Sequence, residues 1–149
     1  MQRKIIPDVV APSNVHAITA QESALRAAQL MDDKNISALV VLDSNKMLQG
    51  IITERDILRK VTAQKKDPEK VLIKTIMTPN PQCLGKDDIA MDALTIFSQG
   101  HFRHLPVTEN GKVLAVVSIR DIFKVCKTQM DEDLKQRDQL LHGTGYGGL

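Results

Sequence analysis

The stretch Gly50-Ile51-Ile52-Thr53-Glu54-Arg55-Asp56 returns, with changes, as Ala115-Val116-Val117-Ser118-Ile119-Arg120-Asp121. In both copies an apolar run leads into a hydroxyl residue, and an Asp follows three positions after the hydroxyl. This spacing is typical of a strand that turns into a helix whose first turn is capped by side chains. The two stretches therefore indicate an internal repeat.

Matching elements precede both stretches. Residues 38–42 and 104–107 are short apolar runs, and each is followed by a turn-prone segment that returns the chain toward residues 48–53 or 113–118. A β-hairpin is predicted in each copy. Before each hairpin, apolar residues recur at helical spacing, which predicts one amphipathic helix per copy. The residues on these faces are Ala24, Ala27, Ala28 and Met31 in the first copy, and Ala90, Ala93, Leu94 and Phe97 in the second.

Extended lead-ins at residues 15–19 and 82–84 complete each unit, so the predicted fold is mixed α/β (α+β), written twice as β-α-β-β-α. The predicted boundaries are 5–64 for the first repeat, 65–72 for an exposed linker and 73–128 for the second repeat. A repeat of this size buries too little apolar surface to be stable alone. We therefore expect the two repeats to pack around a pseudo-two-fold axis, with two related clefts between them.

Residues 129–149 form a predicted C-terminal extension. Met130, Leu134 and Leu141 make a sparse apolar stripe on a helix expected to end at Gly143, and the glycine-rich residues 143–148 predict a mobile end. The stripe is either a solvated helix face or part of the contact in a homodimer.

Composition narrows the classes of partner. Of the 149 residues, 42% are hydrophobic and 26% charged, and the net charge is +2, which gives no global reason to expect nucleic acid or an anionic membrane. No apolar run approaches the roughly 20 residues of a membrane helix, and the first residues do not have the pattern of a signal peptide. Cys83 and Cys126 are expected to be reduced thiols, so the expected location is cytoplasmic.

The doubled layout resembles the CBS domain pair, or Bateman module. Four blocks carry the likeness, which covers roughly residues 5 to 128: the two stretches quoted first, Thr75-Ile76-Met77-Thr78-Pro79, and His101-Phe102-Arg103-His104-Leu105-Pro106-Val107. The resemblance is to small stand-alone CBS proteins with no enzyme or channel attached. It implies that AMP, ADP, ATP or a related adenosyl ligand binds between the repeats, with no obligatory cofactor.

In the family pattern the Asp of this motif accepts hydrogen bonds from the ribose hydroxyls, and the Ser or Thr lies near ribose or phosphate. The resemblance therefore nominates Thr53 with Asp56 for one site and Ser118 with Asp121 for the other. A carboxylate suits this role because it can accept both hydrogens of a cis-diol. The same residues also have the spacing of a capping box, and the two roles are compatible.

Basic residues near the motifs are candidates for phosphate contacts. Arg55 and Arg120 directly precede the two Asp residues, and the free N–H groups where the helix begins also favour a phosphate. In related modules Arg and His at the positions of Arg103 and His104 approach the nucleotide phosphates. A solvated strand end is the alternative for these two residues.

The two clefts are expected to differ. Gly50 becomes Ala115, which adds a methyl group where glycine allows backbone or ligand to approach closely. In the first copy the counterparts of Arg103 and His104 are the uncharged Ser37 and Ala38.

The sequence thus favours a regulatory module that senses an adenine nucleotide and signals to an unknown protein partner. The alternative is a constitutive dimerisation or interaction scaffold without a functional ligand. A redox or metal role through the cysteines or through His101 and His104 is a third option, although two histidines without a third ligand do not make a metal site. No nucleophile elbow or phosphate-binding loop occurs, so no enzyme activity is expected.

Overall fold

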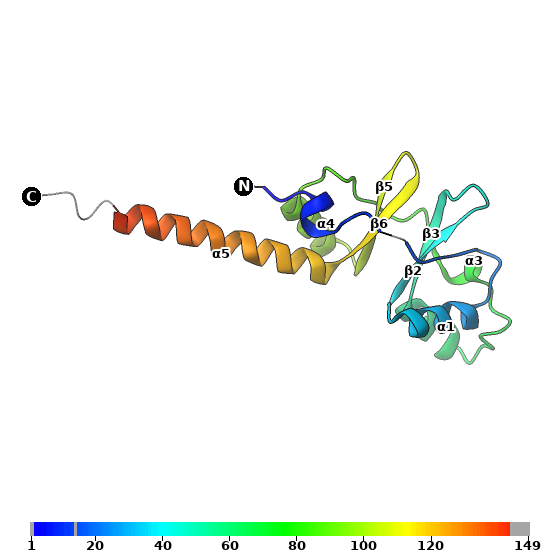
Figure 1. Cartoon of the computed structure of the whole chain (residues 1–149). Helices are drawn as coiled ribbons and strands as arrows, with labels where there is room; N and C mark the ends of the chain where they lie inside the picture. Colours follow the sequence, from blue (N-terminus) through cyan, green and yellow to red (C-terminus); the bar gives the residue numbers. More distant parts are fainter. Residues whose placement is uncertain (1, 14, 144–149) are drawn as a thin grey trace, which may run out of the picture.

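The computed structural model describes residues 2–13 and 15–143 and contains two similar lobes and one projecting helix (Figure 1). The first lobe contains β1 (Ala17–Ile18), α1 (Ala24–Lys34), β2 (Ala38–Leu42), β3 (Leu48–Thr53), α2 (Glu54–Ile57) and η2 (Leu58–Thr62). The second contains α4 (Ala90–Gln99), β5 (His104–Glu109), β6 (Lys112–Ser118) and α5 (Ile119–Gly143). Three short elements remain, namely η1 (Ile5–Val9), α3 (Ile73–Ile76) and β4 (Thr78–Pro79).

The amphipathic helices form as predicted. At the start of α1 the Ser23 hydroxyl accepts a hydrogen bond from the Arg26 N–H at 3.1 Å, and at its end Asn35 is left-handed with φ of 52°. Helices commonly end in this way because Asn tolerates the left-handed conformation. The buried residues are Ala24, Ala27 and Met31 on α1 and Ala90, Ala93 and Phe97 on α4.

Both predicted hairpins are present. β2 pairs antiparallel with β3, with Leu39 opposite Ile52, and β5 pairs antiparallel with β6, with Leu105 opposite Val117. The lead-in strands are shorter than predicted. In the first lobe β1 runs parallel to β2 over Ala17–Ile18, whereas in the second only a single bridge joins Leu84 to Val107.

The first residues of each repeat cross to the other lobe. β4 lies near the start of the second repeat but pairs with β3 of the first, and the Asn80 N–H donates to the Gln49 carbonyl at 3.0 Å. In the same way the Ser13 N–H, near the start of the first repeat, donates to the Leu114 carbonyl of β6 at 3.3 Å. Each lobe therefore borrows an edge segment from the chain that leads into the other.

The cores show the same exchange. Ile73 and Ile76 of α3 are buried in the first core, and Ile5 is buried in the second with Leu84, Phe97 and Ile122. The predicted first repeat, 5–64, begins at Ile5, but in space Ile5 packs in the core of the second lobe. Apolar residues in a short segment do not encode which of two similar cores they enter.

Gly50 is the point of closest approach between β3 and the borrowed segment. A Cβ atom at this position would lie 2.8 Å from the Thr78 carbonyl oxygen and 2.7 Å from the Met77 sulfur. The close packing of β3 against the segment at Met77 and Thr78 therefore explains why a residue without a side chain stands at position 50. At the equivalent place in the second lobe, the methyl group of Ala115 is fully buried.

α5 continues beyond the second lobe as a projecting helix (Figure 1). The helix predicted for the C-terminal extension is confirmed up to Gly143. The glycine-rich end predicted to be mobile lies outside the described residues from position 144 onward. Within the described part of the chain, no helix has the length and apolar character needed to span a membrane.

Gly50→Ala should destabilise the protein by roughly 1–3 kcal/mol, because the added methyl group forces the Thr78 carbonyl and the β3–β4 pairing to shift. Urea unfolding followed by circular dichroism measures this loss. Gly143→Ala is the control, since nothing lies within 4 Å of a Cβ at that position. A Gly50→Ala protein as stable as the parent would show that the borrowed segment is not packed this closely.

Candidate functional site

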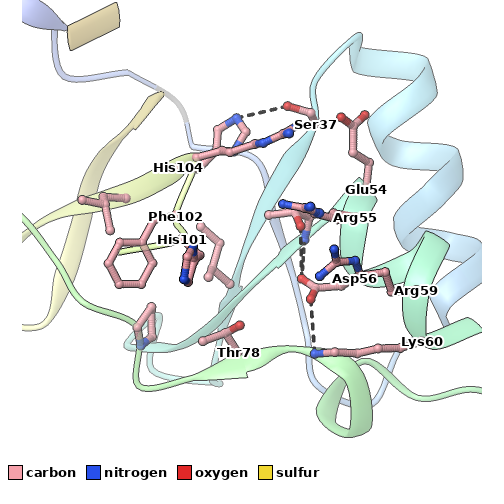
Figure 2. A pocket seen from close by; sticks show the side chains of 15 residues that line it. Ser37, Glu54, Arg55, Asp56, Arg59, Lys60, Thr78, His101, Phe102 and His104 are labelled. Carbon is pink, nitrogen blue, oxygen red and sulfur yellow. Dashed lines mark hydrogen bonds and ion pairs between the residues drawn. The ribbon is translucent and has the colours of Figure 1, made fainter. Parts of the chain in front are cut away.

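A cavity of about 340 Å³ lies between the two lobes and is called here the Asp56 cleft. One wall comes from the end of β3 and the start of the following helix, and the opposite wall comes from residues 101–105 of the second repeat. Thr78 and Pro81, from the borrowed segment, also line it. Figure 2 shows Arg55, Asp56, Arg59 and Lys60 on one side of this space and His101 and Phe102 on the other.

Asp56 is held in place by its own helix start. Its Oδ2 accepts hydrogen bonds from the Thr53 N–H at 3.0 Å and the Thr53 hydroxyl at 3.2 Å. Its Oδ1 lies 3.2 Å from the Lys60 ammonium, and 17% of the side chain is exposed. The capping role predicted from spacing is thus present, and the carboxylate still lines the cleft.

The Asp56 cleft is rich in positive charge. Four cationic side chains line it, Arg55, Arg59, Lys60 and Arg103, against the two carboxylates of Glu54 and Asp56. Lys60 is further positioned by donating to the Ile76 carbonyl at 2.8 Å. Cations that converge on a partly enclosed space attract an anion more strongly than the same charges spread over a surface.

A second cavity, the Asp121 cleft, has a volume of about 450 Å³ and is built from equivalent positions. Val116, Ser118 and Asp121 face residues 35–38 of the first repeat, and Ser13 lines it as part of the N-terminal segment. The Asp121 Oδ2 accepts from the Ser118 N–H at 2.9 Å and the Ser118 hydroxyl at 2.8 Å. The described residues that line this cleft include no Lys or Arg.

His104 and Ser37 line both clefts and form the wall between them. The His104 Nε2 and the Ser37 Oγ are 3.1 Å apart, while the Nδ1 is buried with no hydrogen-bond partner among the described residues. Burial lowers the pKa of His104, an effect that the carboxylates of Glu54 and Asp121 partly oppose. The imidazole is therefore neutral at pH 7 in the unliganded protein.

The structure brings most of the predicted site residues together. Thr53, Arg55, Asp56, Arg103 and His104 all line the Asp56 cleft, although they come from different repeats. Ser118 and Asp121 line the other cleft, where His104 is the nearest predicted phosphate residue. Arg120 is exposed and is not among the residues that line either cleft. The ligand-binding roles of these residues stay predictions.

Sequence reasoning did not nominate several residues of the Asp56 cleft, namely Ser37, Arg59, Lys60 and Phe102. Lys60 had a readable signal, because a cation four positions after Asp56 lies on the same helix face. Phe102 had none, since its contact with the cleft depends on the packing of the lobes. His101, which was a candidate metal ligand, lines the same cleft. Within residues 2–13 and 15–143 there is no group of three His, Cys, Asp or Glu side chains that could hold a metal ion.

Comparison with known proteins agrees with the repeat and the fold. A model of the CBS domain family matches residues 7–63 and 73–128. Among curated relatives, the CBS domain-containing protein CBSCBSPB5 of Arabidopsis thaliana is 42% identical over 122 residues, which cover 80% of this chain and 22% of that protein. The first five relatives of this kind are matched over only 20% to 24% of their own length.

Solved structures show the same architecture. The CBS-domain protein NE2398 is 35% identical, with a TM-score of 0.69 over 74% of this chain and 86% of that chain. CBSX2, crystallised in complex with AMP, shares the fold at 22% identity and a TM-score of 0.65, over 78% of this chain and 90% of that chain. Each matched segment contains one of the two hairpins and the helix start that follows it, and the chain therefore belongs to the CBS domain family as a tandem pair of CBS repeats.

Proposed function

We propose that the Asp56 cleft binds an adenine nucleotide and that the CBS pair acts as a regulatory module for a protein partner. The observation that carries the proposal is the composition of this cleft. A capped carboxylate, four cationic side chains and an apolar surface all line one cavity of about 340 Å³. These groups match the ribose, the phosphate and the base of a nucleotide, and the volume lies within the range of small-molecule sites.

Asp56 is the proposed ribose acceptor. Its Oδ2 already accepts two hydrogen bonds from Thr53, and its Oδ1 forms an ion pair with the Lys60 ammonium. A carboxylate has about four acceptor positions, so a bound diol competes with Lys60 for Oδ1 while the cap at Oδ2 remains. Lys60 then becomes available to a phosphate.

The phosphate is proposed to lie between the two walls. Arg55, Arg59 and Lys60 come from the first repeat and Arg103 from the second, so an anion that contacts both groups bridges the lobes. Charge-assisted hydrogen bonds from Arg are strong because the guanidinium can bind a phosphate through two parallel N–H groups.

The base is proposed to lie against the apolar part of the cleft. Ile51, Pro81, Phe102 and Leu105 line it. Ile51 and Leu105 belong to the two hairpins and are buried to 6% and 1% exposure, so this surface is firmly supported. A flat base needs such a preformed apolar surface to exclude water from its faces.

A ligand that touches both lobes is proposed to change how they sit relative to each other. Such a ligand shifts a conformational equilibrium only by the difference between its affinities for the two states. Regulation of a protein partner therefore requires that the partner distinguish these states. We propose no catalytic role. The complex of CBSX2 with AMP makes AMP the first ligand to test, followed by ADP and ATP.

Asp56→Asn should weaken AMP binding by about tenfold to a hundredfold, the scale of a lost charge-assisted hydrogen bond. The amide oxygen of Asn can still accept from the Thr53 N–H, so the helix start is retained. Isothermal titration calorimetry measures the affinity, and thermal melting reports on the cap. Asp121→Asn is the matched control, which should leave the affinity of the Asp56 cleft unchanged.

If AMP, ADP and ATP give neither heat nor a melting shift at millimolar concentration, the sensor proposal fails and the scaffold alternative stands. If Asp56→Asn lowers the melting temperature but leaves the affinity as it was, Asp56 is a cap alone.

The free energy of unfolding should fall as the pH drops below about 6.5, the value for histidine in an unfolded chain. Because burial lowers the pKa of His104, the unfolded state binds a proton that the folded state resists. Stability from this source is complete above pH 6.5 and is lost as the pH falls toward the folded-state value. Urea unfolding between pH 5 and pH 8 measures it.

His104→Gln should reduce this pH dependence, whereas His101→Gln, at an exposed position of the same cleft, should retain it. Equal slopes for the parent and His104→Gln would show that the wall between the clefts does not hold a neutral imidazole.

A further inference from the structure

His104 is the only titratable side chain, among the described residues, that lines both clefts. It begins β5, where it lies opposite Ser118 of β6, and its Nε2 lies 3.1 Å from the hydroxyl of Ser37 in the first lobe. The hairpin of the second lobe thus sets the position of the ring, and a contact with the first lobe holds it there. His104 is therefore placed to respond to what either cleft contains.

The structure favours the neutral form of this ring when no ligand is bound. The Nδ1 atom is buried and has no hydrogen-bond partner among the described residues. An imidazolium carries an N–H on both nitrogens, so the charged ring would leave the buried N–H at Nδ1 unpaired, which is unfavourable. The neutral ring avoids this when its hydrogen is on Nε2, where the Ser37 hydroxyl can accept it.

Charged groups from several elements surround the ring. Burial is the largest influence on the pKa of His104 and lowers it. The carboxylates of Glu54 and Asp121 oppose this effect, whereas the guanidinium of Arg103 acts in the same direction as burial. In the Asp56 cleft four cations face two carboxylates, so a bound anion changes the balance of charge around the ring. The charged and titratable residues that line the two clefts beside His104 are Glu54, Arg55 and Asp56 on α2, Arg59 and Lys60 on η2, His101 and Arg103 before β5, His16 before β1, and Asp121 on α5.

We propose that His104 takes up a proton when the Asp56 cleft binds a phosphorylated nucleotide, so that this residue makes binding respond to the charge of the ligand. This coupling rests on the proposed nucleotide binding in the same cleft. A phosphate places negative charge in a cavity that the ring lines, and it pairs with Arg103, whose charge otherwise opposes protonation. An opposite charge within a few ångströms favours the charged form of a histidine. The phosphate oxygens also supply hydrogen-bond acceptors.

The coupling makes the affinity for AMP depend on pH. Because the complex holds a proton that the free protein lacks, a lower pH favours the complex. The affinity is therefore highest below the pKa of His104 in the free protein, which burial keeps under the usual 6.5, and it falls as the pH rises through the pKa in the complex. A pKa that rises by 1 corresponds to about tenfold in affinity across this range.

Proton NMR of the imidazole rings tests the coupling directly, because the chain has only four histidines, His16, His101, His104 and His142. The pKa of each is measured between pH 5 and pH 8.5 without ligand, with saturating AMP and with adenosine, which lacks the phosphate. The pKa of His104 should rise by about 1 or more with AMP and stay unchanged with adenosine. That of His142, which lines neither cleft, should not change with either ligand. A His104 pKa that AMP leaves unchanged, or that adenosine raises equally, would overturn the proposal.

Isothermal titration calorimetry in buffers of different ionisation enthalpy counts the protons taken up with AMP at pH 7. The phosphate of AMP itself titrates near about pH 6, so the parent is compared with His104→Gln, in which the contribution of the ligand is the same. The parent should take up more protons than His104→Gln and as many as His142→Gln. Equal uptake by the parent and His104→Gln would contradict the coupling. If AMP does not bind at all, the nucleotide-binding proposal fails as well, whereas binding without a change at His104 removes the coupling alone.

Discussion

The exchange of edge segments between the lobes is the constraint on which the rest of the structure depends. β4 belongs to the start of the second repeat but pairs at the edge of the first sheet, and Ser13, near the start of the first repeat, donates a hydrogen bond to Leu114 of β6. Because each lobe contacts chain from the other repeat, the two lobes are held together. The same segments then line the clefts, since Thr78 borders one and Ser13 the other.

The two clefts are built from equivalent positions of the two repeats, but different residues occupy these positions, so the clefts differ. Residues 101–104 of the second repeat face the Asp of the first, and residues 35–38 of the first repeat face the Asp of the second. The position of Arg103 is occupied in the other cleft by Ser37. The cationic side chains therefore gather around Asp56, while the described residues that line the Asp121 cleft include no Lys or Arg.

Much of the fold could be predicted from the sequence, because each pattern that indicates a helix or a hairpin occurs twice, once in each repeat. The faces of α1 and α4 and the two hairpins follow from periodicity, and the capping geometry of Asp56 and Asp121 follows from spacing. The exchange of segments could not be predicted, because the apolar character of Ile5 and Ile73 does not indicate which of the two similar cores each residue enters. In the sequence, the motif around Asp56 and the basic strand at Arg103 belong to separate repeats. The packing of the lobes brings both into one cleft, and the sequence does not encode this packing in a readable way. Arg55 lines a cleft and Arg120 does not, although each directly precedes the Asp of its motif.

The central claim is that one cleft, built from both repeats, accepts the nucleotide. Amide NMR spectra recorded during a titration with AMP test it most directly, because each repeat reports separately. We expect concerted shifts at Thr53 to Asp56 of the first repeat and at His101 to His104 of the second. Shifts confined to Ser118 to Asp121 and residues 35–38, or none at all, would contradict it.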